Sequence, residues 1–298
     1  MAQVRVFMRL LIELGNLVLQ KKRWPDDRMF LQAVYRACLK RNPDADGEEF
    51  YISMLWRKSM NRIDVLKSVL SSNEFKQVHG LPIHPLEAVH QARMMLVRRC
   101  LPSAQVIVDL GGADQTHREG ALLAMGYPYR PQRLIIIDLS LPKHRSWITP
   151  NGIHIVHYKG SMTDLSWIES ESVDLVWAGE SIEHVTQAEA EVVFREVYRI
   201  LRPGGYFCLD TPNASLTRLQ SPNVLIHPEH KKEYYVTELR SLIESQGFQV
   251  REAKGICPMP ESLRSGIFNY REIVENIRLS DNPQEGYLFY IMAIKPIQ

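Results

Sequence analysis

The chain has 298 residues, enough for one large domain or for a domain of ordinary size joined to a small one. Hydrophobic residues make up 45% and charged residues 23%, an ordinary balance for a globular protein with a substantial core. The 36 basic and 34 acidic side chains leave a net charge of +2, which argues against a strong general attraction to DNA or to an anionic membrane. The four cysteines form no CxxC pair, which argues against a zinc knuckle and favours reduced thiols in a cytoplasmic protein.

The first 24 residues contain an apolar run that Arg5, Arg9 and Glu13 interrupt, so they fit neither a signal peptide nor a membrane span. Apolar side chains recur there at helical spacing: Val4, Phe7, Leu11, Leu14 and Val18. We expect an amphipathic helix that packs on the protein or on a second subunit, forming a homo-oligomer. Peripheral contact with a membrane is the alternative, because Arg and Lys flank the apolar face.

Residues 26 to about 80 show three apolar stripes at helical spacing, separated by the helix-breaking stretch "RNPDADG". The stripes are Phe30, Leu31, Val34, Tyr35 and Leu39; then Phe50, Tyr51, Met54 and Leu55; then Ile63, Val65, Leu66, Val69 and Leu70. This pattern predicts a small, all-helical N-terminal domain over residues 1–80.

The same region resembles a known family. The stretch "FLQAVYRACLKRNPDADGEEFYISML", followed by "SVLSSNEF", is similar to the DUF4214 module in its aromatic–Tyr–Leu helix, its Arg–x–Pro–Asp–x–x–Gly turn and its Ser–x–Glu–Phe end. That module often accompanies enzymes that build or modify surface glycans. The resemblance leaves structural support and glycan docking both open as its role.

The stretch "HGLPIHP", residues 79–85, reads as a linker, and the pattern after it is different. Short apolar runs rich in β-branched and aromatic residues alternate with helical segments, which predicts a mainly parallel α/β sheet with both faces covered. The runs are "VIVDL", "RLIIIDL", "VDLVWAG", "GYFCLD" and "YLFYIMAIK". We therefore expect a second domain over residues 81–298.

A ligand site is expected where the first of these strands ends. "VIVDL" leads directly into "GGADQ", so an acidic residue and two glycines, Gly111 and Gly112, open a turn into a helix. In such sheets ligands bind outside the carboxyl ends of the strands, and glycine lets the backbone approach them closely. The second strand ends at Asp138, where a carboxylate can accept from ribose hydroxyls. A two-glycine turn alone is also compatible with an ordinary strand–helix connection.

The segments "GSMTDL", "VDLVWAGESIEHV" and "REVYRILRPGGYFCLDTPN" resemble the class I S-adenosylmethionine (SAM)-dependent methyltransferases, from about Val106 to the C-terminus. The resemblance implies a Rossmann-like, doubly wound, mainly parallel seven-stranded sheet. It implies that Asp109 and Gly111 line the methionine end of SAM and that Asp138 binds the ribose. It also implies a frame for the adenine, made by Met162, Asp164 and Leu165.

Two features depart from the family pattern. Ala113 stands where a further glycine is usual, and the stretch between the first two strands is long. Alanine is small enough to be accommodated in the turn, but the departure leaves a non-catalytic homologue open.

The stretch "GESIEHV", residues 179–185, concentrates Glu180, Glu183 and His184 within five positions. On a helix these residues would share one face. Acidic residues at a helix start explain one glutamate, but a divalent cation explains all three side chains. A fourth ligand is expected from "HPEHKKEYY", which contains His227 and His230.

Glu–x–x–Glu–His followed by Thr–Pro–Asn and a later His–Lys is similar to the small-RNA 3′-terminal 2′-O-methyltransferases, and ubiquinone-pathway O-methyltransferases share much of it. The RNA family binds a metal that grips neighbouring ribose hydroxyls. The resemblance implies Glu180, Glu183, His184 and His230 as the catalytic metal ligands here, with magnesium expected first and manganese or zinc as alternatives.

The leading functional hypothesis is a metal-dependent SAM:sugar hydroxyl O-methyltransferase acting on a glycan, polysaccharide or glycolipid in the cytoplasm. Methylation of the 3′-terminal ribose of RNA uses the same site, but the balanced charge and the DUF4214-like module favour a saccharide acceptor. A non-catalytic glycan-binding protein is the third reading.

Overall fold

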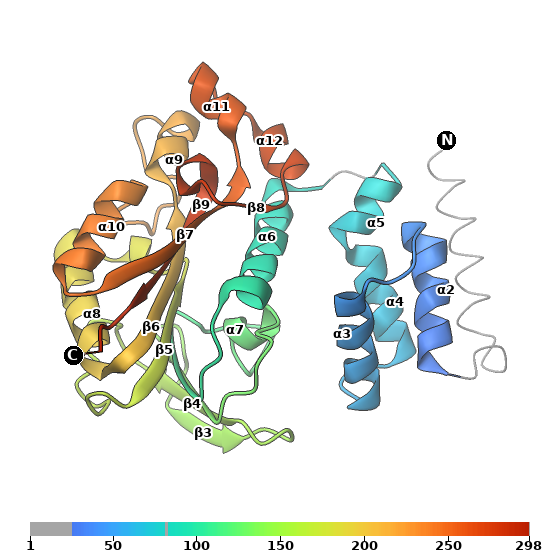
Figure 1. Cartoon of the computed structure of the whole chain (residues 1–298), viewed down its shortest axis with the longest axis horizontal. Helices are drawn as coiled ribbons and strands as arrows, with labels where there is room; N and C mark the ends of the chain where they lie inside the picture. The colour runs from blue at the N-terminus through green and yellow to red at the C-terminus, as the bar shows by residue number, and fades with distance from the viewer. Residues whose placement is uncertain (1–25, 81–82, 298) are drawn as a thin grey trace. The chain divides into compact units, whose positions relative to one another are not determined.

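The computed structural model describes residues 26–80 and 83–297 (Figure 1). The chain divides into two compact units, with the boundary between His84 and Pro85. The amphipathic helix expected near the N-terminus lies outside the described residues.

The first unit is helical in its described part. Its helices are α2 (Asp27–Leu39), α3 (Ala45–Trp56), α4 (Arg62–Ser71) and α5 (Asn73–Val78). Side chains of Asp26, Asp44 and Asn61 accept hydrogen bonds at the starts of α2, α3 and α4, which explains where these helices begin. The expected stripe on α2 and most of the stripe on α4 form the core with Phe75, but Ile63 on α4 is 49% exposed. The stripe on α3 is only half-buried.

The second unit contains one large sheet. The described strands are β1 (Val106–Leu110), β2 (Arg133–Asp138), β3 (Arg145–Ile148), β4 (His154–Lys159), β5 (Val173–Gly179), β6 (Leu201–Pro212), β7 (Gln249–Pro258), β8 (Leu279–Ser280) and β9 (Gly286–Ile294). Their order in space is β3-β4-β2-β1-β5-β6-β9-β7-β8. Pairing is parallel from β4 to β6, and β9 runs antiparallel to both β6 and β7.

The predicted seven-stranded sheet needs correction, because the described residues form nine strands in a mixed sheet. The two additional strands, β3 and β8, are short, antiparallel and at the sheet edges. Edge strands carry little apolar periodicity because they are solvated, so their sequence signal is weak. Between these edges, the central seven strands lie in the order β4-β2-β1-β5-β6-β9-β7.

Helices cover both faces of the sheet. Figure 1 shows α8 (Gln187–Ile200) and α10 (Val236–Ser245) on one side and α6 (Pro85–Cys100) on the other. Residues of α8 and α10 join strand residues in one buried hydrophobic cluster. A capping box between Thr186 and Glu189 fixes the start of α8 directly after residues 179–185.

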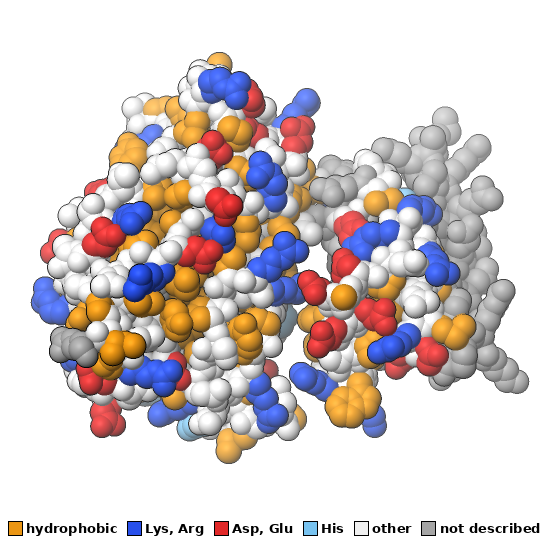
Figure 2. Space-filling view, viewed as in Figure 1, with side chains coloured by type: hydrophobic (Ala, Val, Ile, Leu, Met, Phe, Trp, Pro, Cys, Tyr) orange, Lys and Arg blue, Asp and Glu red, His pale blue; other side chains and the backbone are white. Residues whose placement is uncertain are grey.

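Charges on the visible face of the second unit are mixed, with Lys and Arg lying among Asp and Glu (Figure 2). In the described parts of the chain, no helix has the length and apolar character needed to cross a membrane.

Candidate functional site

The turn after β1 has a geometry that requires glycine. Gly111 has a φ of 78°, and its N–H donates to the Ile137 carbonyl at 2.8 Å, which ties the turn to β2. A Cβ on Gly112 would lie 2.1 Å from the carboxyl group of Asp109. The turn therefore packs directly on the strand-end carboxylate.

Asp109 is buried, with only 1% of its surface exposed, and its Oδ2 has no hydrogen-bond partner among the described residues. Burial, followed by the repulsion of Asp138, raises the pKa of Asp109 to about 7. An unpartnered, buried carboxylate oxygen at the carboxyl end of a strand suits a ligand that carries N–H donors and positive charge. The methionine end of SAM has both.

Asp138 ends β2 and faces the same turn. Its Oδ2 accepts from the Ala113 N–H at 3.2 Å, and its Oδ1 accepts from the Ser140 N–H at 2.7 Å. Ala113, the departure noted in the sequence, is therefore accommodated and contributes to positioning this carboxylate. The residues expected at the methionine and ribose ends of SAM lie together at one edge of the sheet.

The residues expected around the adenine lie in the loop after β4. Asp164 is exposed and accepts from the Ser166 N–H and Oγ, hydrogen bonds that lower the pKa of its carboxyl group. Met162 is half-buried, whereas the side chain of Leu165 is wholly buried in the core and supports the loop from beneath. Leu139, directly after Asp138, is 69% exposed and offers an apolar surface that the sequence argument missed.

The segment after β5 does not form the α-helix that would unite its acidic residues. Only Ile182–His184 makes a 3-10 turn, η1. Glu180 has a φ of 47°, a conformation uncommon outside glycine, and its N–H donates to the Asp210 carbonyl at 2.9 Å. Glu180 therefore does not share one helical face with Glu183 and His184.

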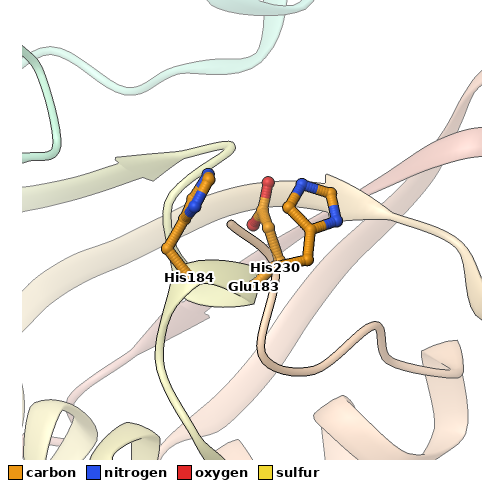
Figure 3. A group of neighbouring side chains, drawn as sticks. All are labelled: Glu183, His184 and His230. Carbon is orange, nitrogen blue, oxygen red and sulfur yellow. The ribbon is translucent and has the colours of Figure 1, made fainter. Parts of the chain in front are cut away.

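Glu183, His184 and His230 come together. One possible ligand atom from each lies within 4.8 Å of the others, and the rings of His184 and His230 are 5.1 Å apart. Figure 3 shows Glu183 between the two imidazoles, with the three side chains pointing to the same side. One carboxylate and two imidazoles are a suitable donor set for a borderline divalent cation.

Main-chain hydrogen bonds bring the His230 loop to this position. The Glu183 carbonyl accepts from the N–H groups of Lys231 at 2.7 Å and Lys232 at 3.2 Å. Asn213 and Tyr234 form an isolated parallel bridge nearby. The loop is thus fixed by backbone contacts to the same segment that supplies the other two side chains.

Buried partners orient the cluster. His230 Nδ1 lies 2.9 Å from Glu233 Oε1, and Glu233 Oε2 accepts from Thr217 Oγ1 at 2.6 Å. Thr211 Oγ1 donates to Glu183 Oε2 at 2.9 Å. These contacts leave His230 Nε2 and Glu183 Oε1 for a ligand, an arrangement typical of metal-binding histidines with a supporting carboxylate.

Glu180, which is close to the cluster, pairs with Arg93. Its Oε2 lies 2.6 Å from Arg93 Nη1, and the same guanidinium forms hydrogen bonds of 2.6 and 3.0 Å with both oxygens of Asp210. Burial opposes the charge of Arg93, but the two carboxylates outweigh it and raise the pKa of the guanidinium. Glu180 as a fourth metal ligand stays a prediction.

The electrostatics of the cluster favour a cation. Burial, followed by repulsion from Glu180, raises the pKa of Glu183 to about 8. Burial and the neighbouring His230 lower the pKa of His184, so its imidazole is neutral and able to coordinate at neutral pH. His227, the weaker candidate, is exposed, and its ring lies 6.2 Å from that of His184.

Sequence reasoning missed Arg93, Asp210 and Glu233. Asp210 stands in "LDTPN" and Glu233 follows His230 by three positions, so both had a local signal. Arg93 had none, because a basic residue on an amphipathic helix is ordinarily solvated.

Two family models match separate parts of this chain. Residues 121–209 match the family model of a methyltransferase domain, and residues 19–79 match DUF4214, a domain of unknown function. The chain is 35% identical over 97 residues to a protein of Mycolicibacterium smegmatis named as a probable S-adenosylmethionine-dependent methyltransferase. These findings support a SAM-dependent methyltransferase. The match spans 33% of this chain and 36% of the relative's length.

Solved structures with the same general description are more distant. A SAM-dependent methyltransferase from Thermotoga maritima is 20% identical, with a TM-score of 0.48 over 70% of this chain and 91% of its own. The small RNA methyltransferase HEN1 is 18% identical, with a TM-score of 0.45 over 70% of this chain and 25% of its own.

Proposed function

We propose that this chain is a metal-dependent SAM:sugar hydroxyl O-methyltransferase that acts on a glycan, polysaccharide or glycolipid. The observation that carries the proposal is the convergence of Glu183, His184 and His230 within 4.8 Å. A cation held by three protein ligands keeps positions open for two neighbouring hydroxyl oxygens. Adjacent hydroxyls on one ring are a common feature of sugars.

The cluster adjoins the cofactor turn. A Cβ on Gly111 would lie 2.8 Å from the Cβ of Ser181, which belongs to the same segment as Glu183. An acceptor bound at the cluster is therefore near the end of the cofactor that carries the methyl group. Close placement is the main requirement, because the sulfonium already activates that methyl group and the reacting atoms must come to about 3 Å.

The reaction is a displacement at carbon. The sugar oxygen forms a bond to the methyl carbon, the carbon–sulfur bond breaks, and S-adenosylhomocysteine leaves with the electron pair on sulfur. The hydroxyl proton passes to solvent water. A bound divalent cation would make that proton easier to lose, as it does for water, whose pKa falls from about 16 to about 7 in the most favourable zinc case. Glu183, His184 and His230 would hold it.

The donor set bears on which metal is expected. Magnesium prefers oxygen ligands, whereas imidazoles suit zinc and manganese accepts both. Because Arg93 engages Glu180, the converging donors are two imidazoles and one carboxylate. We therefore expect manganese or zinc to support activity better than magnesium.

RNA 3′-end methylation is the alternative that shares this chemistry. A nucleic-acid substrate calls for a basic tract along the strand path, whereas the charges in Figure 2 are interspersed and the net charge is only +2. The DUF4214 match over residues 19–79 is consistent with a glycan target or with structural support.

The experiment is a labelled-methyl transfer screen with defined oligosaccharides and single-stranded RNA. Purified enzyme is stripped with chelator and then restored with manganese, zinc or magnesium. We expect transfer to a saccharide only with metal, and at least a tenfold loss when the neighbouring hydroxyl is absent or already methylated, because alignment is lost. Full transfer by metal-free enzyme, or transfer to RNA alone, contradicts the proposal.

A further inference from the structure

Two short helices are inserted between β7 and β8, at the edge of the sheet where β6 and β7 end. β7 ends at Pro258 and leads into α11 (Pro260–Ser265) and α12 (Tyr270–Glu275), while β6 leads into α9 (Ala214–Gln220). β6 and β7 both pair antiparallel with β9, so they run in the same direction and their carboxyl ends share one edge. α11 contacts α9 there, as Figure 1 shows.

This insertion carries part of an aromatic group. The rings of Phe268 and Tyr270 lie 4.9 Å apart, and those of Phe268 and Tyr287 lie 5.8 Å apart, all in edge-on packing. Tyr287 is buried, Phe268 is half-buried, and Tyr270 is 53% exposed beside Ile267, which is 71% exposed. We call Phe268, Tyr270 and Tyr287 the aromatic platform.

Gln220 fixes the platform to α9. Its Nε2 donates to the Tyr270 hydroxyl at 3.1 Å, and its Oε1 accepts from the Tyr287 hydroxyl at 2.8 Å. An exposed aromatic ring without a hydrogen-bond partner for its hydroxyl would be free to change its orientation. Here the amide of Gln220 holds the half-exposed ring of Tyr270 in place.

The same helix reaches the metal-binding cluster. Thr217 is three residues before Gln220, so the two side chains are neighbours on α9, about 5–6 Å apart at Cβ. Thr217 donates to Glu233 at 2.6 Å, and Glu233 lies 2.9 Å from His230. Burial and then the neighbouring Tyr270 raise the pKa of Tyr287, with smaller contributions from the carboxylates of Glu180 and Glu233.

We propose that the aromatic platform is an acceptor subsite that packs against a sugar ring adjacent in the chain to the one that is methylated. This inference rests on the proposed function. A pyranose presents an apolar face of C–H groups and a rim of hydroxyls, which matches a tyrosine ring with a polar edge. The platform and the cluster are connected through α9, on which Thr217 and Gln220 are about one helical turn apart. The acceptor is therefore an oligosaccharide and not a free monosaccharide.

The test compares acceptor chain length in the full-length enzyme with metal and SAM. Tyr270→Ala removes the exposed ring, and Tyr270→Phe keeps the ring but loses the hydroxyl. Tyr129→Ala is the matched control, since Tyr129 is 46% exposed, packs edge-on against Tyr127 at 5.6 Å, and precedes β2 at the opposite edge of the sheet.

For Tyr270→Ala we expect KM for a tetrasaccharide to rise about tenfold with kcat unchanged, whereas KM for the matching monosaccharide is unaffected. Tyr270→Phe should lie between this variant and wild type, and Tyr129→Ala should match wild type. SAM affinity, measured by calorimetry, should be equal in all four proteins.

If wild type methylates saccharides and Tyr270→Ala has the same KM for the tetrasaccharide, the subsite proposal is wrong. The proposed function would still hold. Equal losses with mono- and tetrasaccharide would also overturn the subsite proposal, because they would place Tyr270 at the methylated ring. Transfer by wild type to RNA but to no saccharide would overturn both proposals.

Discussion

His230 Nδ1 lies 2.9 Å from Glu233 Oε1, and the two side chains are exposed by only 8% and 1%. Burial alone would raise the pKa of Glu233, but hydrogen bonds from His230, Thr217 and the Ile226 N–H outweigh it and lower the pKa. Glu233 is therefore a charged, buried carboxylate that holds the His230 ring with Nε2 toward the cluster.

Glu233→Gln should weaken metal binding by about 10–100-fold, because the supporting carboxylate sets the orientation and basicity of the imidazole. Calorimetric titration with manganese and zinc measures this directly. Glu244→Gln is the control, since Glu244 is exposed on α10 and pairs with Arg240. Equal metal affinities in both variants would show that Glu233 does not support metal binding by His230.

Arg93→Met should destabilise the protein by about 3–5 kcal/mol, because it leaves the carboxylate of Asp210 buried without its partner. Adding Asp210→Asn should recover part of this loss by removing the stranded charge. Chemical denaturation of the single and double variants measures both effects. A loss below about 1 kcal/mol would mean that the ion pair contributes little.

Asp138→Ala should reduce SAM affinity at least tenfold, because hydrogen bonds from ribose hydroxyls to a carboxylate contribute about 1.5–3 kcal/mol each. The control is Asp281→Ala, which removes an exposed carboxylate paired with Lys254. Calorimetry in both variants provides the comparison, and unchanged SAM affinity in Asp138→Ala would place the ribose elsewhere.

The pKa of Asp109, raised from 3.8 to about 7, predicts a pH-dependent stability. The folded state binds this proton more tightly than the unfolded state, so stability falls as pH rises between about 4 and 7, by about 4 kcal/mol at most. Asp109→Asn cannot ionise and should lack this part of the fall. We therefore expect the unfolding free energy of Asp109→Asn to rise relative to that of wild type between pH 5 and pH 8. Parallel curves for the two proteins would contradict the raised pKa of Asp109.

Residues 85–298 should fold and bind SAM without the preceding unit. The contact division at Pro85 and the hydrophobic cluster within the second unit support this expectation. Circular dichroism and SAM calorimetry on the truncated chain test it. A truncated protein that folds but does not bind SAM, beside a full-length protein that does, would contradict the proposed division into domains.

The sequence by itself was sufficient for the two strands, β1 and β5, that end at the site. "VIVDL" and "VDLVWAG" coincide with β1 and β5, because buried parallel strands read as continuous apolar runs. The edge strand β3 escaped prediction, because its residues are largely solvated and lack such a run.

Only the tertiary structure decided how the acidic residues of "GESIEHV" are used. Local spacing predicted one helical face, but Arg93 of α6 draws Glu180 away while main-chain bonds to Glu183 bring His230 in. Periodicity reports which residues are buried along one element, and it carries no information on which distant charge will meet them. Glu180 pairs with the Arg93 guanidinium, whereas Glu183 joins His184 and His230. This difference depends on how α6 and residues 227–235 pack against the end of the sheet.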